Sequence, residues 1–121
     1  MATNKAFRSG PVAITNAVAN ILNPPTISGG VNAVATATYL IIRHIRIVNK
    51  TAGAVTISSW IGATGGSAAG TEFAWQGTSV PANSFLDWYG ALRMDVADFM
   101  TMEASASTSL SFEAEGEIGI D

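Results

Sequence analysis

The chain has 121 residues, of which only 12% are charged, and its mean hydropathy is +0.31. Globular proteins carry about 25% charged residues, so this composition indicates a small domain that packs against other protein. It contains no cysteine, which excludes a disulfide framework, a thiolate metal site and a cysteine nucleophile. The net charge of −3 argues against nucleic-acid binding, and no apolar run approaches the ~20 residues that cross a bilayer.

The few charges are divided along the chain. Residues 1–50 contain five bases and no acid, whereas residues 51–121 contain all nine acids and one base, Arg93. We expect the two groups to lie on different surfaces of one domain, where they would serve contacts between subunits or with a partner. The alternative is that Arg43 and Arg46 form ion pairs with acids of the same chain. The division of charge along the sequence would then be weaker evidence for a partner.

The N-terminal segment offers little that could pack in a core. Residues 1–10 are predicted to form an extended arm ahead of a single domain at residues 11–121. Gly10 and Pro11 interrupt any apolar stretch, so this segment does not have the pattern of a signal peptide. Short strands are expected near residues 12–14 and 17–22. Residues 23–37 contain two prolines and a glycine pair, and they predict a long loop, a kind of segment that is often functional.

The clearest strand is residues 38–49, TYLIIRHIRIVN. Strict alternation would place Arg43 and Arg46 on opposite faces, each among β-branched neighbours. Apolar side chains cover both faces, which is typical of a central strand with a neighbour on each side.

Turn residues then recur about every ten residues, and helical periodicity is hard to find. Residues 50–53 predict a tight turn, and GATGGSAAG at residues 62–70 predicts a flexible loop. The remaining predicted strands are residues 54–61, 71–75, 85–89, 99–104 and 110–120. Seven to nine short strands predict an all-β fold, a single antiparallel β-sandwich of jelly-roll or immunoglobulin-like type.

The last strand alternates strictly between apolar and polar residues. Glu113, Glu115 and Glu117 share one face. Two interpretations remain open for this acidic face. It either forms a solvated edge that discourages edge-to-edge aggregation, or it is a docking stripe for a basic partner.

Catalytic chemistry finds little support in the sequence. His44 is the only histidine and lies among isoleucines, which is typical of a packed or interface residue. There is no Gly-x-Ser-x-Gly elbow, no Gly-Lys phosphate loop, and too few ligands for zinc. Asp87, Asp95 and Asp98 fit ordinary turns better than a calcium site. We therefore expect no enzyme activity, no metal and no cofactor.

Three tryptophans allow a different function. Trp60, Trp75 and Trp88 could stack on a sugar if two of them were exposed and coplanar. In a small sandwich, tryptophans more often belong to the core or to a subunit contact. A glycan-binding module is therefore an alternative that depends on an exposed pair.

Several segments together resemble the small β-sandwich structural proteins of tailed bacteriophage virions, and capsid decoration (cement) proteins are the nearest kind. The segments are TYLIIRHIRIVNKTAGAVTISSWIGATGG, GTEFAW, SVPANSFLDWYG and SLSFEAEGEIGID, within residues 38–121. They share with that class a strand with arginines, a Thr-Ala-Gly turn, a Trp-Ile-Gly strand end and a late acidic strand. Tail and head-fibre proteins share the same features.

The resemblance implies a non-enzymatic protein that is made in the host cytoplasm and binds the exterior of the virion, on the major capsid protein of an HK97-type shell. It also implies a homo-oligomer, a trimer or a dimer. Contacts are expected on the arm, the long loop and the central strand. The candidate contact residues are Lys5, Phe7, Arg8, Pro24, Pro25, Ile27, Arg43 and Arg46.

Overall fold

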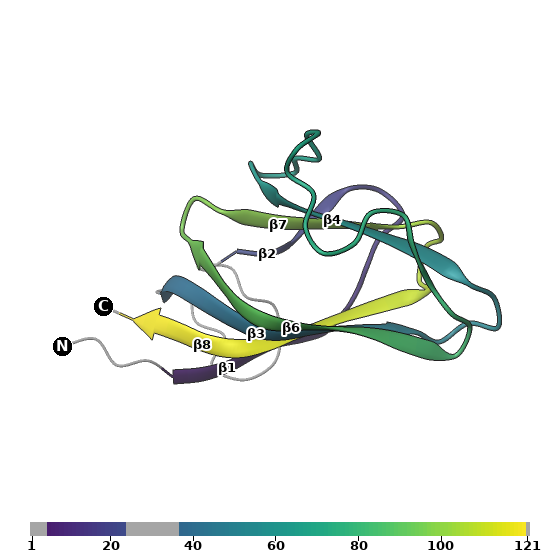
Figure 1. The fold of residues 1–121 in the computed structure, drawn as a ribbon, viewed down its shortest axis with the longest axis horizontal. Helices are drawn as coiled ribbons and strands as arrows, with labels where there is room; N and C mark the ends of the chain where they lie inside the picture. The colour runs from purple at the N-terminus through teal and green to yellow at the C-terminus, as the bar shows by residue number, and fades with distance from the viewer. Residues whose placement is uncertain (1–4, 24–36, 121) are drawn as a thin grey trace.

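The computed structural model describes residues 5–23 and 37–120, and this part of the chain contains strands and no helix. Eight strands form two four-stranded antiparallel sheets that lie face to face (Figure 1). The strands are β1 (Lys5–Ala13), β2 (Ala19–Leu22), β3 (Ala37–Asn49), β4 (Val55–Gly62), β5 (Thr78–Val80), β6 (Ser84–Asp95), β7 (Phe99–Ala104) and β8 (Leu110–Ile120). The predicted β-sandwich is confirmed. Within the described residues, no helix is available that could span a membrane.

The strand order distinguishes between the two predicted types of sandwich. Sheet A has the order β1-β8-β3-β6, and sheet B has the order β2-β7-β4-β5. The chain changes sheet at every connection except the one from β4 to β5. This arrangement is that of the eight-stranded jelly roll, which is built from two Greek keys. The immunoglobulin-like alternative would group its strands differently.

The core lies between the two sheets, and β3 and β8 supply much of it. These two central strands of sheet A run side by side over their whole length. Their fully buried side chains are Leu40, Ile42, Ile45, Ile47, Leu110, Phe112, Ala114 and Ile118. Sheet B covers them with Ile57, Met100 and Met102. The alternation predicted for residues 110–120 is therefore confirmed.

The predicted N-terminal arm is wrong for residues 5–10. These residues belong to β1, which pairs with β8 from Lys5 opposite Ile118 onward. Phe7 is 3% exposed and is part of the core. The segment has one large apolar side chain, so its sequence carries no periodicity that would indicate a strand. Its stability comes from pairing with β8, which is distant in sequence.

The loop between β4 and β5 covers part of the outer face of sheet B, around Trp60 and Thr101. Trp60 and Thr101 alternate with core-facing residues and yet are only 6% and 1% exposed. The Thr101 hydroxyl donates to the carbonyl of Gly66 at 2.6 Å, which anchors the segment predicted to be flexible. The strand predicted at residues 71–75 is reduced to a single bridge between Trp60 and Glu72. Of the two sheets, sheet A is therefore the one whose described outer face is open.

An extra residue in β3 decides which side chains lie on that open face. The register against β8 changes from Ile42 opposite Gly116 to His44 opposite Glu115, which leaves Arg43 as the extra residue of a β-bulge. The core-facing positions are even-numbered before the bulge and odd-numbered after it. The prediction that Arg43 and Arg46 lie on opposite faces is therefore wrong, because the bulge brings both to the outer face of sheet A.

Gly116 is required by the bulge. A Cβ atom at this position would overlap the backbone carbonyl of Ile41, which the bulge brings over β8. We expect Gly116→Ala to lower the free energy of unfolding by about 2–3 kcal/mol, the usual cost of overpacking. Urea unfolding measures this loss. Gly53→Ala is the matched control, since a Cβ at Gly53 meets nothing within 4 Å, and an equal loss in both variants would contradict the steric explanation.

Phe7 provides a test of β1. Its truncation in Phe7→Ala should cost about 3–5 kcal/mol, as for other buried aromatic side chains, because the ring lies in the core. Arg8→Ala, at the adjacent exposed position, should cost about 0.5 kcal/mol or less. Thermal or urea unfolding compares the two. A Phe7→Ala loss as small as that of Arg8→Ala would mean that this segment is an arm after all.

Candidate protein-binding face

The open side of sheet A carries charged and aromatic side chains from all four of its strands. We call it the outer face and define it by Arg8 of β1, Arg43, His44, Arg46 and Val48 of β3, Phe85, Asp87 and Tyr89 of β6, and Glu113, Glu115 and Glu117 of β8. Cross-strand register places opposite charges side by side on it, because Arg46 is opposite both Asp87 and Glu113. Opposite charges directly across two strands stabilise the pairing, and like charges there destabilise it.

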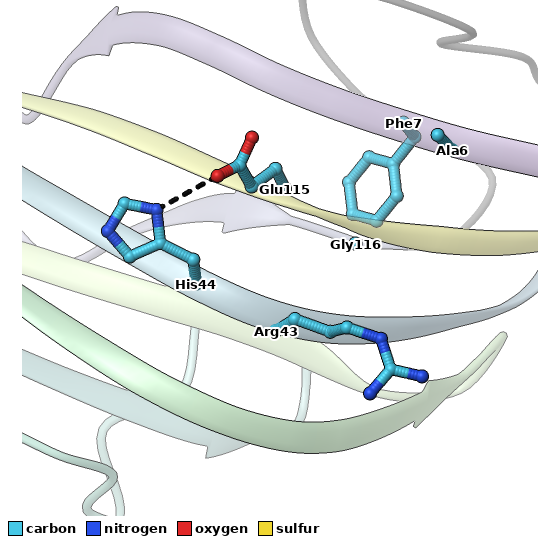
Figure 2. A pocket seen from close by; sticks show the side chains of 6 residues that line it. All are labelled: Ala6, Phe7, Arg43, His44, Glu115 and Gly116. Atoms are coloured by element: carbon cyan, nitrogen blue, oxygen red, sulfur yellow. Dashed lines mark hydrogen bonds and ion pairs between the residues drawn. The ribbon is translucent and has the colours of Figure 1, made fainter.

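His44 lies at the centre of the outer face and joins three strands. Its Nε2 atom is 2.8 Å from Oδ1 of Asp87 on β6, and its Nδ1 atom is 3.1 Å from Oε1 of Glu115 on β8. The His44 side chain is only 14% exposed. Figure 2 shows His44 and Glu115 turned toward each other, while Arg43 extends away from them.

Asp87 is the most strongly held carboxylate of the outer face. Arg46 donates to it from Nε at 2.8 Å and from Nη2 at 3.0 Å, one bond to each carboxylate oxygen. Such two-pronged guanidinium–carboxylate pairs are among the stronger hydrogen bonds in proteins. The bonds from Arg46, aided by the one from His44 and opposed by partial desolvation, lower the pKa of Asp87 to about 2.

The basic and acidic parts of the chain therefore meet on one face. Arg43 donates to Glu117 at 2.7 Å, and Arg46 is bound to Asp87. The alternative in which the two arginines pair with acids of the same chain is therefore confirmed. The expectation that acids and bases occupy different surfaces is wrong. The edge interpretation of the glutamates is also wrong, since β8 lies between β1 and β3.

Apolar side chains lie beside the paired charges. Tyr89 is 69% exposed, Phe85 49% and Val48 38%. The Tyr89 ring stacks on His44 with a centroid distance of 4.7 Å, and the Arg46 guanidinium lies 4.3 Å from the centre of the Phe85 ring. The outer face thus combines exposed aromatic area with charges that already have partners.

A shallow depression of about 290 Å³ opens on the outer face at the bulge (Figure 2). It is lined by Ala6, Phe7, Arg43, His44, Glu115 and Gly116. Its volume is at the lower limit for small-molecule sites, which are concave and enclosed. It is shallow and open, unlike such an enclosed site.

The structure places the predicted contact residues whose side chains it describes in two different environments. Arg8, Arg43 and Arg46 lie together on the outer face, and Arg8 is opposite Glu115 in register. Phe7 is a core residue and is not available for a surface contact. Lys5 begins β1, and its side chain is outside the described part of the structure. Pro24, Pro25 and Ile27, in the predicted long loop, also fall outside the described residues.

Sequence reasoning missed the part of the outer face that β6 contributes. The segment FLDWY was recognised as a strand, but Phe85, Asp87 and Tyr89 were not recognised as one face of it. Their alternation was visible in the sequence. What the sequence did not show was the pairing of β6 with β3, which places Asp87 opposite Arg46.

The exposed tryptophan pair that a glycan-binding module needs is not present. Trp60 and Trp75 are buried, at 6% and 9% exposure. Trp88 is partly buried and packs edge-on against Phe73, with ring centres 5.1 Å apart. The condition for the glycan-binding alternative is therefore not met.

The geometry of His44 cross-links strands, because both of its ring nitrogens contact carboxylates. Within the described residues, no group of three or more histidine, cysteine or acidic side chains could hold a metal ion.

No known family model matches the chain, and no curated protein matches it significantly. Among solved structures, it is similar to the crystal structure of PirA, with 14% identity, a TM-score of 0.40, and coverage of 94% of this chain and 92% of that chain. It is also similar to a structure of infectious bursal disease virus Gx strain, with 13% identity and a TM-score of 0.40. That match covers 99% of this chain and 30% of the other. Likenesses at this level identify neither a family nor a function.

The low pKa of Asp87 predicts how stability depends on pH. The folded value of about 2 lies below the ordinary value of 3.8, so the ionised carboxylate stabilises the fold above about pH 4, and this contribution is lost as the pH falls through 2. Asp87→Asn should therefore be less stable than the wild type at neutral pH. The difference should shrink between pH 4 and pH 2 in urea unfolding. Asp95→Asn removes the same charge from the same strand at a position that is 58% exposed, and an equal loss there would contradict the assignment.

Proposed function

We propose that the chain is a non-enzymatic structural protein of a tailed-phage virion that binds the outer surface of an HK97-type capsid shell through the outer face of sheet A. The observation that carries this proposal is the exposure of Tyr89, Phe85 and Val48 on a sheet face most of whose charges are already paired. The role of a capsid decoration protein comes from the sequence resemblance.

The composition of the outer face favours a protein partner. Aromatic residues and arginine are enriched at the centres of protein interfaces, where they supply most of the binding energy. Tyr89 and Phe85 present large rings that are held in place by His44 and Arg46. Rings that are already oriented lose little conformational freedom on binding.

Internal pairing of the charges makes the outer face easier to cover. A partner that buries an unpaired charge must overcome a desolvation cost of several kcal/mol. On this face, Arg46 is already bound to Asp87 and Arg43 to Glu117. The partner therefore needs to supply complementary shape and apolar area more than counter-charges, which agrees with the low charge content of the chain.

The jelly-roll topology is compatible with this role. Viral capsid domains use this fold, as do lectins and cupins. An interface of about 1,000 Å² removes enough apolar area, at roughly 25 cal/mol per Å², to support specific binding. A dimer or trimer on a symmetric shell would multiply weak contacts through avidity. The protein would be made in the host cytoplasm and would end on the virion exterior.

The test is binding to capsid shells that lack the protein. Purified protein is added to HK97-type shells, and co-sedimentation and the temperature of shell rupture are measured. We expect saturable binding and a higher rupture temperature. Binding to isolated tails or head fibres in place of shells would assign the protein to those structures. A lack of saturable binding to shells, tails and fibres would overturn the proposal.

A pair of variants tests the surface. Tyr89→Ala should weaken shell binding at least tenfold, about 1.4 kcal/mol, because it removes the most exposed aromatic side chain of the outer face. Val96→Ala is the matched control. Val96 is also an exposed apolar residue, at 51%, but it lies in the turn between β6 and β7. Equal weakening in both variants would exclude the outer face as the contact.

A further inference from the structure

His44 contacts a carboxylate at each of its two ring nitrogens. Asp87 is on β6 and Glu115 is on β8, so the imidazole connects the strands on either side of β3. Ionised carboxylates only accept hydrogen bonds, and a neutral imidazole has one N–H group to donate. Both bonds can form together only when the ring carries two protons and a positive charge.

We propose that His44 is a proton-operated switch that ties β6 to β8 across β3 and sets the charge of the outer face. Histidine is the side chain whose charge ordinarily changes between pH 5 and 8. In the protonated state both bonds are made. In the neutral state one ring nitrogen presents a lone pair to a carboxylate, and that contact is lost.

The surroundings of the two carboxylates determine which contact is lost. The Asp87 side chain is 15% exposed and is held by two bonds from Arg46. The Glu115 side chain is 55% exposed and can turn into water. The neutral ring should therefore keep its remaining proton on Nε2, facing Asp87, and release Glu115.

The charged and titratable groups around His44 belong to all the neighbouring strands. They are Arg43 and Arg46 on β3, Asp87 and Tyr89 on β6, Glu113, Glu115 and Glu117 on β8, and Arg8 on β1. The residues joined by ion pairs are three bases and three acids, counting protonated His44. Loss of the proton leaves this set with a net charge of −1 and with Glu115 unpaired.

The switch has a consequence for any partner that covers the outer face. With His44 protonated, the partner covers a set of paired charges. With His44 neutral, it must cover an unpaired carboxylate at Glu115 or leave it solvated, and burial of an unpaired charge is costly. Binding should therefore be weaker with His44 neutral than with His44 protonated. The switch itself is a property of the isolated chain and goes beyond the proposed function.

The experiment uses nuclear magnetic resonance on the isolated protein. His44 is the only histidine, so the imidazole signals belong to it, and only Nδ1 and Nε2 must be distinguished from each other. We expect both nitrogens to be protonated at acidic pH and the Nε2–H tautomer at alkaline pH. The side-chain carboxyl carbon of Glu115 should shift over the same pH interval, whereas that of Glu113, on the same strand and face, should stay nearly constant.

A variant separates coupling from the intrinsic behaviour of Glu115. In His44→Gln the Glu115 carboxyl shift should no longer change between pH 5.5 and 8.5. The inference is overturned by an Nδ1–H tautomer at alkaline pH, by a Glu115 carbon that does not follow His44, or by an equal Glu115 shift in His44→Gln. Because no shell is present, failure of capsid binding would leave this result unaffected.

Discussion

The extra residue in β3 at Arg43 determines how the outer face of sheet A is built. Before the bulge, the even-numbered residues of β3 face the core, and after it the odd-numbered ones do. Without this change of phase, Arg43 and Arg46 would lie on opposite sides of the sheet. The bulge instead brings Arg43, His44 and Arg46 to one face, where the acids of β6 and β8 meet them. Gly116 makes the bulge possible, since only a residue without a side chain fits beneath the carbonyl of Ile41.

The charge network in turn organises the aromatic part of the face. His44 is fixed between two carboxylates and provides a flat support for Tyr89, and Arg46 is fixed by Asp87 and lies over Phe85. Asp87 is thus the common point of both branches. Through His44 and Arg46, the partly buried Asp87 positions the exposed rings of Tyr89 and Phe85.

The sequence predicted the all-β fold and the strands that carry strong alternation, and it missed features that depend on pairing between distant segments. Residues 110–120 alternate strictly, so their buried face could be named in advance. Phe7 is a single apolar residue in a polar segment, so the local pattern predicts an arm and not a strand. The bulge could not be predicted for a different reason. The pattern around Arg43 is equally consistent with regular alternation. Only the pairing of β3 with Gly116 on the next strand distinguishes the bulge from it. The contact of Arg46 with Asp87 likewise depends on β3–β6 pairing, which no local pattern indicates.

The covering of sheet B by the chain's own β4–β5 loop gives the sandwich two unequal sides. Trp60 and Thr101 are sealed beneath that loop, whereas Tyr89 and Phe85 on the opposite sheet are open to solvent. In the proposed role, the side with Tyr89 and Phe85 would face the shell, and the side covered by the loop would face the surroundings. Coated particles would then present to one another a side that has no exposed aromatic surface of this kind among the described residues.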